Sequence, residues 1–348
     1  MPDNSRPITL LHVSDPQFGR NHRFGNLALP PPDDTFDSLL VRLGDDLRLL
    51  ESGHGLRPDV LVLSGDLAEW GRGSEFDDVL QFAEGLTQRL QLPRQRVVLI
   101  PGNHDINRAA CEAYFKNCEA EEGKPVAPFW PKWRFYKHCF HRFYADCPEV
   151  TFTEAEPWTL FAMPELKLVI AGLHSTMRES HRDEDHYGYL GEAQLRWFAD
   201  KLAPYQQKGW LRIAALHHNI RRGPVADDEN LRDVDDLQRL LGPEINLILH
   251  GHTHDGKLDW LTPAIPILSA GSAAVQQAQR PEEIPNQFQI WRDRVTRWTR
   301  AFDPRSKRWI GDTRASVAGS DWWDAQPATF VAVHGTFPDA DVTPAAPS

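Results

Sequence analysis

The stretch Val97-Val98-Leu99-Ile100-Pro101-Gly102-Asn103-His104-Asp105 joins a short apolar run to a group of polar side chains. An apolar run with β-branched residues that ends in Pro-Gly predicts a buried strand that breaks into a tight loop. Open α/β sheets bind their ligands in the crevice outside the carboxyl ends of the strands. We therefore expect Asn103 and His104 to lie at a strand end where a ligand binds.

The same pattern, an apolar run followed by residues that can bind metal, occurs four more times. The four places are Ile8–Ser14 before Asp15-Pro16-Gln17, Val60–Ser64 before Gly65-Asp66, Leu211–Leu216 before His217-His218, and Ile245–Leu249 before His250-Gly251-His252-Thr253-His254. Residues two apart in extended backbone point the same way. The pairs Asp15/Gln17 and His252/His254 therefore have the spacing that a shared metal site requires.

Aspartates at strand ends also form turns and caps, and Asp15 or Asp66 taken singly admits that interpretation. A turn-forming role would have to explain the whole ordered set at once, so we favour the metal site. His218 and His250 are neighbours of these residues and are expected in supporting or core positions. His12, inside the first apolar run, is expected to be a core histidine.

The composition is that of a globular protein. With 348 residues, the chain can form one large α/β domain with an insertion, or two smaller domains. Its 41% hydrophobic and 25% charged residues are ordinary for a soluble protein. The net charge of -11 argues against broad binding to nucleic acid, which requires a basic face.

The sequence contains no membrane-directing segment. The first seven residues lead into a strand-length apolar run rather than a signal peptide, and no run of 18 apolar residues predicts a membrane span. We therefore expect a cytoplasmic protein. Four cysteines without C-x-x-C spacing are expected to be reduced thiols, and a structural zinc site with His138 or His141 is the alternative. They are Cys111, Cys118, Cys139 and Cys147.

Helical periodicity separates the first three strands. Apolar residues at helical spacing from Phe36 to Leu50 predict one helix, and those from Phe76 to Leu86 predict another. Ser74, with Asp77 three residues on, is the expected N-cap of the second helix. The first hundred residues thus read as a right-handed, parallel β-α-β-α-β unit.

Residues 107–164 interrupt this alternation and are rich in aromatic and basic side chains. We interpret them as a helical insertion that packs on the core, with stacking of a nucleotide base as the alternative. Leu168–Leu173 is expected to resume the sheet. Later strands are expected to form a second sheet packed on the first, and they are Ile265–Ala270, Phe288–Trp291 and Arg297–Phe302. We expect one domain over residues 1–320, and an extension over residues 321–348 that ends in a mobile tail.

The ordered motifs over residues 8–275 resemble the calcineurin-like metallophosphoesterases, including the cyclic-nucleotide phosphodiesterase-like and purple-acid-phosphatase-like members. The resemblance implies an α/β fold, a four-layer αββα sandwich. It also implies two metal ions that share the carboxylate of Asp66. By this resemblance one metal is bound by Asp15, Gln17, Asp66 and His254, and the other by Asp66, Asn103, His217 and His252.

The family's catalytic histidine corresponds to His104, and the resemblance gives Asp105 the role of fixing its tautomer and raising its pKa. Arg221 and Arg222 follow His217 and could bind substrate phosphate, and a solvated loop is the alternative. Gln17 stands where the family usually has histidine. Because an amide oxygen is a weaker and harder ligand than imidazole, we expect weaker binding of the first metal or a preference for manganese. His22, a few residues on, could partly compensate.

The function that the resemblance implies is hydrolysis of a phosphate ester by attack of a metal-bound hydroxide. The expected metals are Mn²⁺ and/or Fe, with Zn²⁺ possible, and the expected substrate is a small phosphate ester or nucleotide. Residues 65–71 and the chain length favour a phosphodiesterase of cyclic-nucleotide type, although Glu69 replaces a usual Asp. A phosphomonoesterase or phosphoprotein phosphatase is the alternative. A nuclease or a non-catalytic metal-binding scaffold is less favoured.

Overall fold

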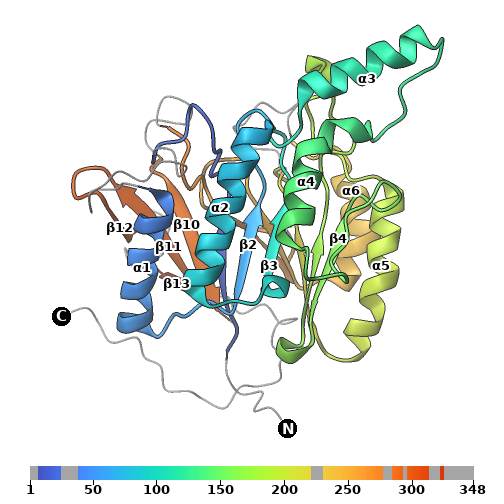
Figure 1. The fold of residues 1–348 in the computed structure, drawn as a ribbon. Helices are drawn as coiled ribbons and strands as arrows, with labels where there is room; N and C mark the ends of the chain where they lie inside the picture. The colour runs from blue at the N-terminus through green and yellow to red at the C-terminus, as the bar shows by residue number, and fades with distance from the viewer. Residues whose placement is uncertain are drawn as a thin grey trace.

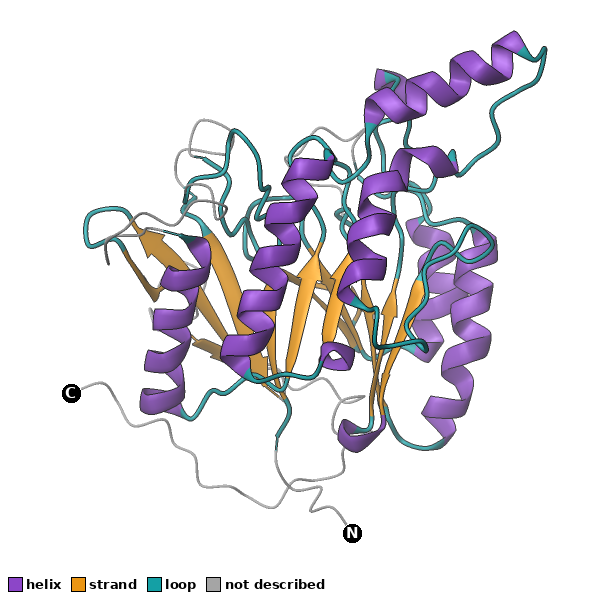
Figure 2. Cartoon of the chain, in the orientation of Figure 1, coloured by secondary structure: helices purple, strands orange, loops and turns teal. Residues whose placement is uncertain are grey.

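Two mixed sheets pack face to face between layers of helices (Figures 1 and 2). The structure is a computed structural model that describes residues 7–24, 38–220, 230–276, 284–292, 296–312 and 322–324. The predicted α/β class, with two facing sheets flanked by helices, is confirmed.

The first sheet has the order β12-β11-β10-β1-β2-β3, and β13 pairs with the start of β11, on the same edge as β12. Its strands are β1 (Thr9–Val13), β2 (Val60–Ser64), β3 (Val97–Ile100), β10 (Gln287–Arg292), β11 (Thr296–Asp303), β12 (Arg308–Gly311) and β13 (Trp322–Asp324). β1, β2 and β3 are parallel, as the predicted β-α-β-α-β unit requires. The expected extension therefore contributes β13 to this sheet, and residues 325–348 lie outside the described residues.

The second sheet has the order β4-β5-β6-β7-β9-β8, with β5, β6, β7 and β9 parallel. Its strands are β4 (Thr159–Met163), β5 (Leu168–Gly172), β6 (Leu211–Ala215), β7 (Leu247–His250), β8 (Leu258–Thr262) and β9 (Ile265–Ser269). β4, within the range given to the insertion, is thus an edge strand of this sheet.

Two predictions about strand partners are wrong. β5 does not resume the first sheet but pairs with β6 in the second. Of the three late strands assigned to the second sheet, β10 and β11 extend the first, where β10 runs antiparallel to β1. An apolar run identifies a buried strand, but it does not specify its neighbour, since either sheet would bury it.

Side chains of the second sheet point alternately to its two faces, and each face packs against a different layer. In β5, Leu168 and Ile170 face the large core between the sheets, while Val169 and Ala171 face the outer helices. A second, smaller core lies between this sheet and the outer helices. It is covered by α5 (Glu192–Gln207) and by the segment after α6 (Val234–Asp236). Helices α1 (Leu39–His54), α2 (Gly73–Leu90) and α4 (Arg134–Phe143) cover the front of the first sheet in Figure 1.

The N-terminus of α2 differs from the prediction. The N-cap is Arg72, and Ser74 lies inside the first turn. The carboxylate of Glu75 accepts hydrogen bonds from the backbone N–H groups of Arg72 (3.0 Å) and Trp70 (2.9 Å). Glu75 holds the position that Asp77 was expected to hold, because the helix begins two residues earlier.

The insertion packs its aromatic residues into the large core, which confirms the packing interpretation. Tyr136, Phe140 and Phe143 on α4 are buried there. The hydroxyl of Tyr136 donates to the carbonyl of Leu99 (3.1 Å), and that of Tyr144 donates to the carbonyl of Val97 (2.6 Å). The insertion's other helix, α3 (Arg108–Ala120), projects from the body at the upper right of Figure 1.

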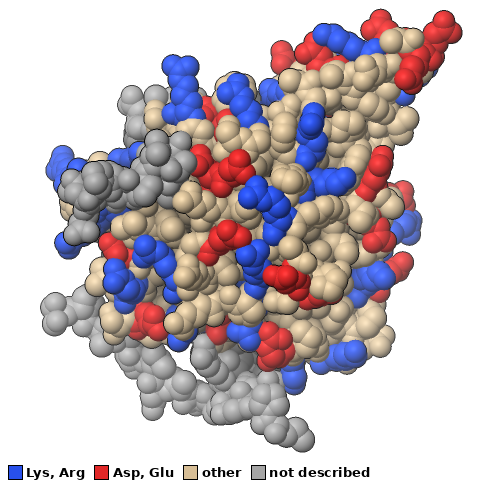
Figure 3. All heavy atoms as spheres, viewed as in Figure 1, with Lys and Arg blue, Asp and Glu red and all other residues tan. Residues whose placement is uncertain are grey.

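The remaining general expectations concern thiols, membranes and charge. The four cysteines are free, and three of them are buried. Within the residues that the structure describes, no helix is both long enough and apolar enough to cross a membrane. On the face shown in Figure 3, acidic and basic side chains are interspersed.

Candidate metal centre

The candidate site lies where the carboxyl ends of strands from both sheets meet. Asp15 and Gln17 follow β1, Asp66 follows β2, and Asn103 follows β3 of the first sheet. The second sheet contributes the loops after β6 and β7, which carry the histidines His217, His252 and His254. The structure therefore brings seven predicted ligands from five strands together.

Five of these seven residues have a positive φ. They are Asp15 (52°), Gln17 (40°), Asp66 (50°), His252 (69°) and His254 (55°). Such backbone conformations are strained for side-chain-bearing residues, and they cluster at functional sites where the surroundings enforce them.

Two glycines allow the loops to approach one another. A Cβ at Gly102 would lie 2.2 Å from Asp66 Oδ1, and one at Gly65 would lie 2.5 Å from His217 Nδ1. The Gly-Asp and Gly-Asn sequences thus reflect close packing of loops from different strands.

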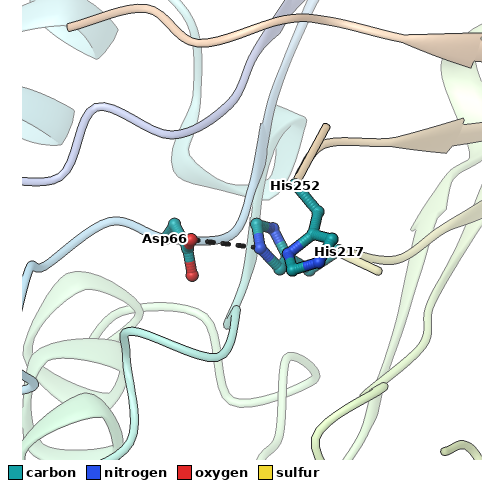
Figure 4. A group of neighbouring side chains, drawn as sticks. All are labelled: Asp66, His217 and His252. Carbon is teal, nitrogen blue, oxygen red and sulfur yellow. Dashed lines mark ion pairs between the residues drawn. The ribbon is translucent and has the colours of Figure 1, made fainter. Parts of the chain in front are cut away.

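Asp66 contacts residues from three other loops, and Figure 4 shows its carboxylate directed at His217. Its Oδ2 is 3.2 Å from His217 Nε2 and accepts a hydrogen bond from Gln17 Nε2 (3.3 Å), and its Oδ1 accepts from the backbone N–H of His104 (2.9 Å). Burial alone would raise the pKa of Asp66, but the charges of His217 and His104 hold it well below the usual value. Burial likewise opposes the charge of His217, yet Asp66 raises the pKa of His217 to about 10.

Asn103 completes one group of possible ligands. Its Oδ1 lies 3.0 Å from His217 Nε2 and 3.2 Å from His252 Nδ1. Ligand atoms of Asp66, His217 and His252 all lie within 4.8 Å of one another. One carboxylate, two imidazoles and one amide oxygen thus converge as the resemblance implies.

The second group is built around Asp15. Asp15 is completely buried, its Oδ1 lies 3.1 Å from His254 Nε2, and its Oδ2 accepts from the backbone N–H of His252 (3.2 Å). Burial would raise the pKa of Asp15, but the contacts with His254 lower it. Asp15 and His254, together with Gln17 and Asp66, form the other predicted ligand set.

The residues fit a pair of metal ions. Two buried carboxylates, three imidazoles and two amides offer the oxygen and nitrogen ligands that Mn, Fe and Zn use. The short contacts between His217 and Asp66 and between His254 and Asp15 bring ligand atoms to within 3.2 Å of one another. A histidine must be neutral to bind metal, so metal binding would release the proton that Asp66 stabilises on His217.

His104 lies beside this group, but Asp105 does not act as predicted. His104 Nδ1 lies 2.8 Å from the backbone carbonyl of Glu69, which accepts its hydrogen bond. The Asp105 carboxylate instead accepts from the backbone N–H groups of Leu67, Ala68 and Gly102. Asp105 therefore ties the loops after β2 and β3 together, and the prediction that it orients His104 is wrong.

Of the three proposed substrate-binding residues, only His22 lies among the described residues. Arg221 and Arg222 lie outside the described residues. His22 is buried, its Nδ1 lies 2.6 Å from the carbonyl of Pro16, and its ring stacks on Phe18 at 4.4 Å. It is not among the residues that line the cavity at the metal centre.

That cavity has a volume of 310 Å³ and opens beside the metal-ligand residues. Its lining residues are Asp66, Asn103, His104, Arg108, Glu179, His186, His218, His252 and His254. Sequence reasoning missed Arg108, Glu179 and His186. Burial raises the pKa of Glu179 to about 8. Glu179 lies in the loop after β5, seven residues beyond the strand end, where no sequence motif marks it as a site residue.

Comparison with known proteins agrees with the family resemblance of the sequence motifs. Residues 8–256 match the model of the calcineurin-like phosphoesterase family. The chain is 26% identical over 258 residues to a cAMP/cGMP dual specificity phosphodiesterase of Mycobacterium tuberculosis (strain CDC 1551 / Oshkosh), an alignment that covers 72% of this chain and 64% of that protein. The chain thus spans somewhat less than two thirds of this relative.

A crystal structure described as a dimetal phosphatase from Danio rerio has a similar fold. It is 14% identical, has a TM-score of 0.53, and is matched over 88% of this chain and 98% of its own. The family model covers well over half of the chain, and its region contains all the motifs that carry the candidate ligands. The chain therefore belongs to the calcineurin-like phosphoesterase family, a family of phosphoric ester hydrolases.

Proposed function

We propose that this protein is a dinuclear metal-dependent phosphodiesterase that acts on cyclic nucleotides. The observation that carries the proposal is the convergence of seven candidate ligand residues from both sheets beside one cavity, which four of them line. Asp66 contacts members of both ligand groups, Gln17 and His217. Two bound metal ions would supply a nucleophile near neutral pH and neutralise charge on the phosphoryl oxygens.

His104 supplies the proton chemistry in this proposal. Because the carbonyl of Glu69 can only accept a hydrogen bond, Nδ1 of His104 carries a proton. Nε2 is then the ring atom that exchanges a proton with the substrate, and His104 lines the cavity. Once protonated there, it would give its proton to the departing oxygen.

The cyclic-nucleotide part of the proposal is supported by the mycobacterial relative, which is described as a cAMP/cGMP phosphodiesterase. The acidic net charge of the chain disfavours a long nucleic acid as substrate. We propose Mn²⁺ or Fe as the metals, because Gln17 contributes a hard amide oxygen. We also propose a cytoplasmic location, since the four free cysteines suit a reducing compartment.

A turnover panel tests the proposal. Purified protein loaded with Mn²⁺ is assayed with bis-p-nitrophenyl phosphate, p-nitrophenyl phosphate, cyclic AMP and a phosphopeptide. We expect turnover of the diester and of cyclic AMP, and none by the Asp66→Asn variant. A preference for p-nitrophenyl phosphate or phosphopeptide would instead identify a phosphomonoesterase or a phosphoprotein phosphatase.

A further inference from the structure

Glu179 places a carboxyl group in the cavity wall that the metal chemistry does not use. Its side chain is 1% exposed, and both carboxyl oxygens lack a hydrogen-bond partner among the described residues. Buried polar groups in folded proteins are nearly always hydrogen-bonded. An unsatisfied, buried pair of acceptors that faces a cavity therefore indicates a group that arrives with the ligand.

The backbone around Glu179 is held firmly by the insertion. Lys132 is buried, and its ammonium group donates to the carbonyls of Thr176 and Glu179, each at 2.6 Å. The backbone N–H of Glu179 donates to the carbonyl of Thr176 (3.2 Å). Lys132 thus fixes the loop that carries Glu179 through its main chain, and its hydrogen bonds do not involve the carboxyl group.

The nearest basic side chains also lie too far from this carboxyl group to hydrogen-bond to it. Arg108 Nη2 is 3.7 Å from Oε1, and His218 Nε2 is 4.0 Å from Oε2. Both distances exceed the 2.7–3.2 Å of an N–H···O hydrogen bond. Arg108 and His218 thus lie next to the carboxyl group but do not donate hydrogen bonds to it.

We propose that Glu179 accepts a hydrogen bond from a hydroxyl group on the alcohol portion of the substrate. The substrate class is then a phosphate ester of a hydroxyl-bearing alcohol such as ribose, and the inference rests on the proposed phosphoesterase function. Glu179, Asp66 and Asn103 line the same cavity, so one ester can reach both the metal ligands and Glu179.

The surroundings favour a hydroxyl group over a cationic donor. Arg108 already places a positive charge 3.7 Å from Glu179, and two bound metal ions would add more. A neutral hydroxyl group satisfies the carboxyl group without repulsion from these cations. Whether ionised or protonated, the carboxyl group retains an oxygen that accepts from a hydroxyl group.

The test compares substrates that differ by one hydroxyl group. Wild-type protein with Mn²⁺ is assayed with three pairs: cyclic AMP and its 2′-deoxy analogue, ribose and 2-deoxyribose 5-phosphate, and a ribo- and a deoxyribodinucleotide. For whichever pair is hydrolysed, we expect kcat/KM to be at least about tenfold higher with the ribose compound, since a site built to bind a hydroxyl group rejects an analogue without it.

The variant Glu179→Met, which keeps an unbranched side chain but removes both acceptors, should bring this ratio close to one. It should leave hydrolysis of bis-p-nitrophenyl phosphate, which has no hydroxyl group, within about threefold of wild type. Glu179→Gln, which keeps one acceptor oxygen, should restore part of the preference. Glu184→Met, a matched change at an exposed glutamate in the same loop, should behave like wild type.

Three outcomes overturn the inference. One is a wild-type enzyme that does not distinguish ribose from deoxyribose in any pair. Another is an equal loss by Glu179→Met on all substrates, bis-p-nitrophenyl phosphate included, which would show a structural role. The third is the absence of turnover of every ester, which removes the proposed function as well, whereas turnover of bis-p-nitrophenyl phosphate shows that the hydrolase function stands on its own.

Discussion

Gln17 places an amide where the family resemblance implies an imidazole, and its backbone has a φ of 40°. Its Nε2 donates to Asp66 at 3.3 Å, so the side chain already reaches the shared carboxylate. We predict that Gln17→His increases the affinity for the metal ion that Asp15 and His254 would also bind, because imidazole is the stronger ligand. Half-maximal activity should occur at a manganese concentration about tenfold lower, the size of effect that changes beside metal ligands produce.

A matched control separates ligation from backbone strain. Gln91, at the exposed end of α2, has a similar φ of 54°, and Gln91→His should not change the manganese titration. An unaltered titration for Gln17→His as well would show that residue 17 does not coordinate metal.

His104 is tied to the main chain rather than to a carboxylate, and this defines its test. We predict that His104→Ala keeps two bound metals but lowers turnover by about 10²–10⁴, the usual contribution of a general acid. The loss should be larger for an alkyl ester than for a p-nitrophenyl ester, because p-nitrophenolate leaves without a proton. The measurements are metal analysis and kcat for both esters.

Two results would contradict this role for His104. Equal losses on both esters would leave only electrostatic stabilisation of the transition state. Loss of one bound metal would make His104 a ligand.

At the scale of elements, the loop between β5 and α5 packs against the insertion through His174. The His174 ring lies 4.3 Å from the ring of Trp133 and stacks on Phe152 at 5.5 Å. Burial, together with the charge of Lys132, holds the pKa of His174 well below 6.5. The folded protein therefore keeps this ring neutral in a pH range in which the unfolded chain protonates it.

This difference predicts how stability depends on pH. Below pH 6.5 the unfolded state binds a proton at His174 that the folded state does not. The contribution of His174 to the free energy of unfolding therefore falls by about 1.4 kcal/mol for each unit by which the pH decreases. His174→Phe should remove that part of the slope between pH 6.5 and pH 5 in urea unfolding. His138→Phe, on the exposed side of α4, should leave the slope unchanged, and an equal slope in His174→Phe and wild type would refute the prediction.

The elements also show which parts of the fold the sequence could predict. The strand ends that carry Asp15, Asp66, Asn103, His217 and His252 were predictable, because each combines a buried run with a metal-binding side chain. The partners of β5, β10 and β11 were not, since pairing depends on which face is left uncovered by the rest of the chain. Glu179 was missed because a lone glutamate in a loop carries no spacing pattern.

At the scale of the whole molecule, both sheets contribute residues to the candidate metal centre, so we expect metal binding to stabilise the entire fold. A ligand that binds only the folded state at 100 times its Kd adds about 2.7 kcal/mol to the free energy of unfolding. We predict that Mn²⁺ raises the melting temperature of the wild-type protein and that a chelator reverses this. Asp66→Asn, which removes the shared carboxylate, should show a much smaller shift in calorimetry. A wild-type melting temperature independent of metal would contradict a dinuclear site across the two sheets.

The antiparallel pairing of β1 with β10 has a consequence for synthesis of the protein. About 270 residues separate β1 from β10, the strand that pairs with one of its edges, so β10 is synthesised long after β1. At about 5–20 residues per second, a ribosome needs tens of seconds to bridge that interval. During this time the nascent chain exposes an uncovered apolar strand edge, the kind of surface that molecular chaperones shield.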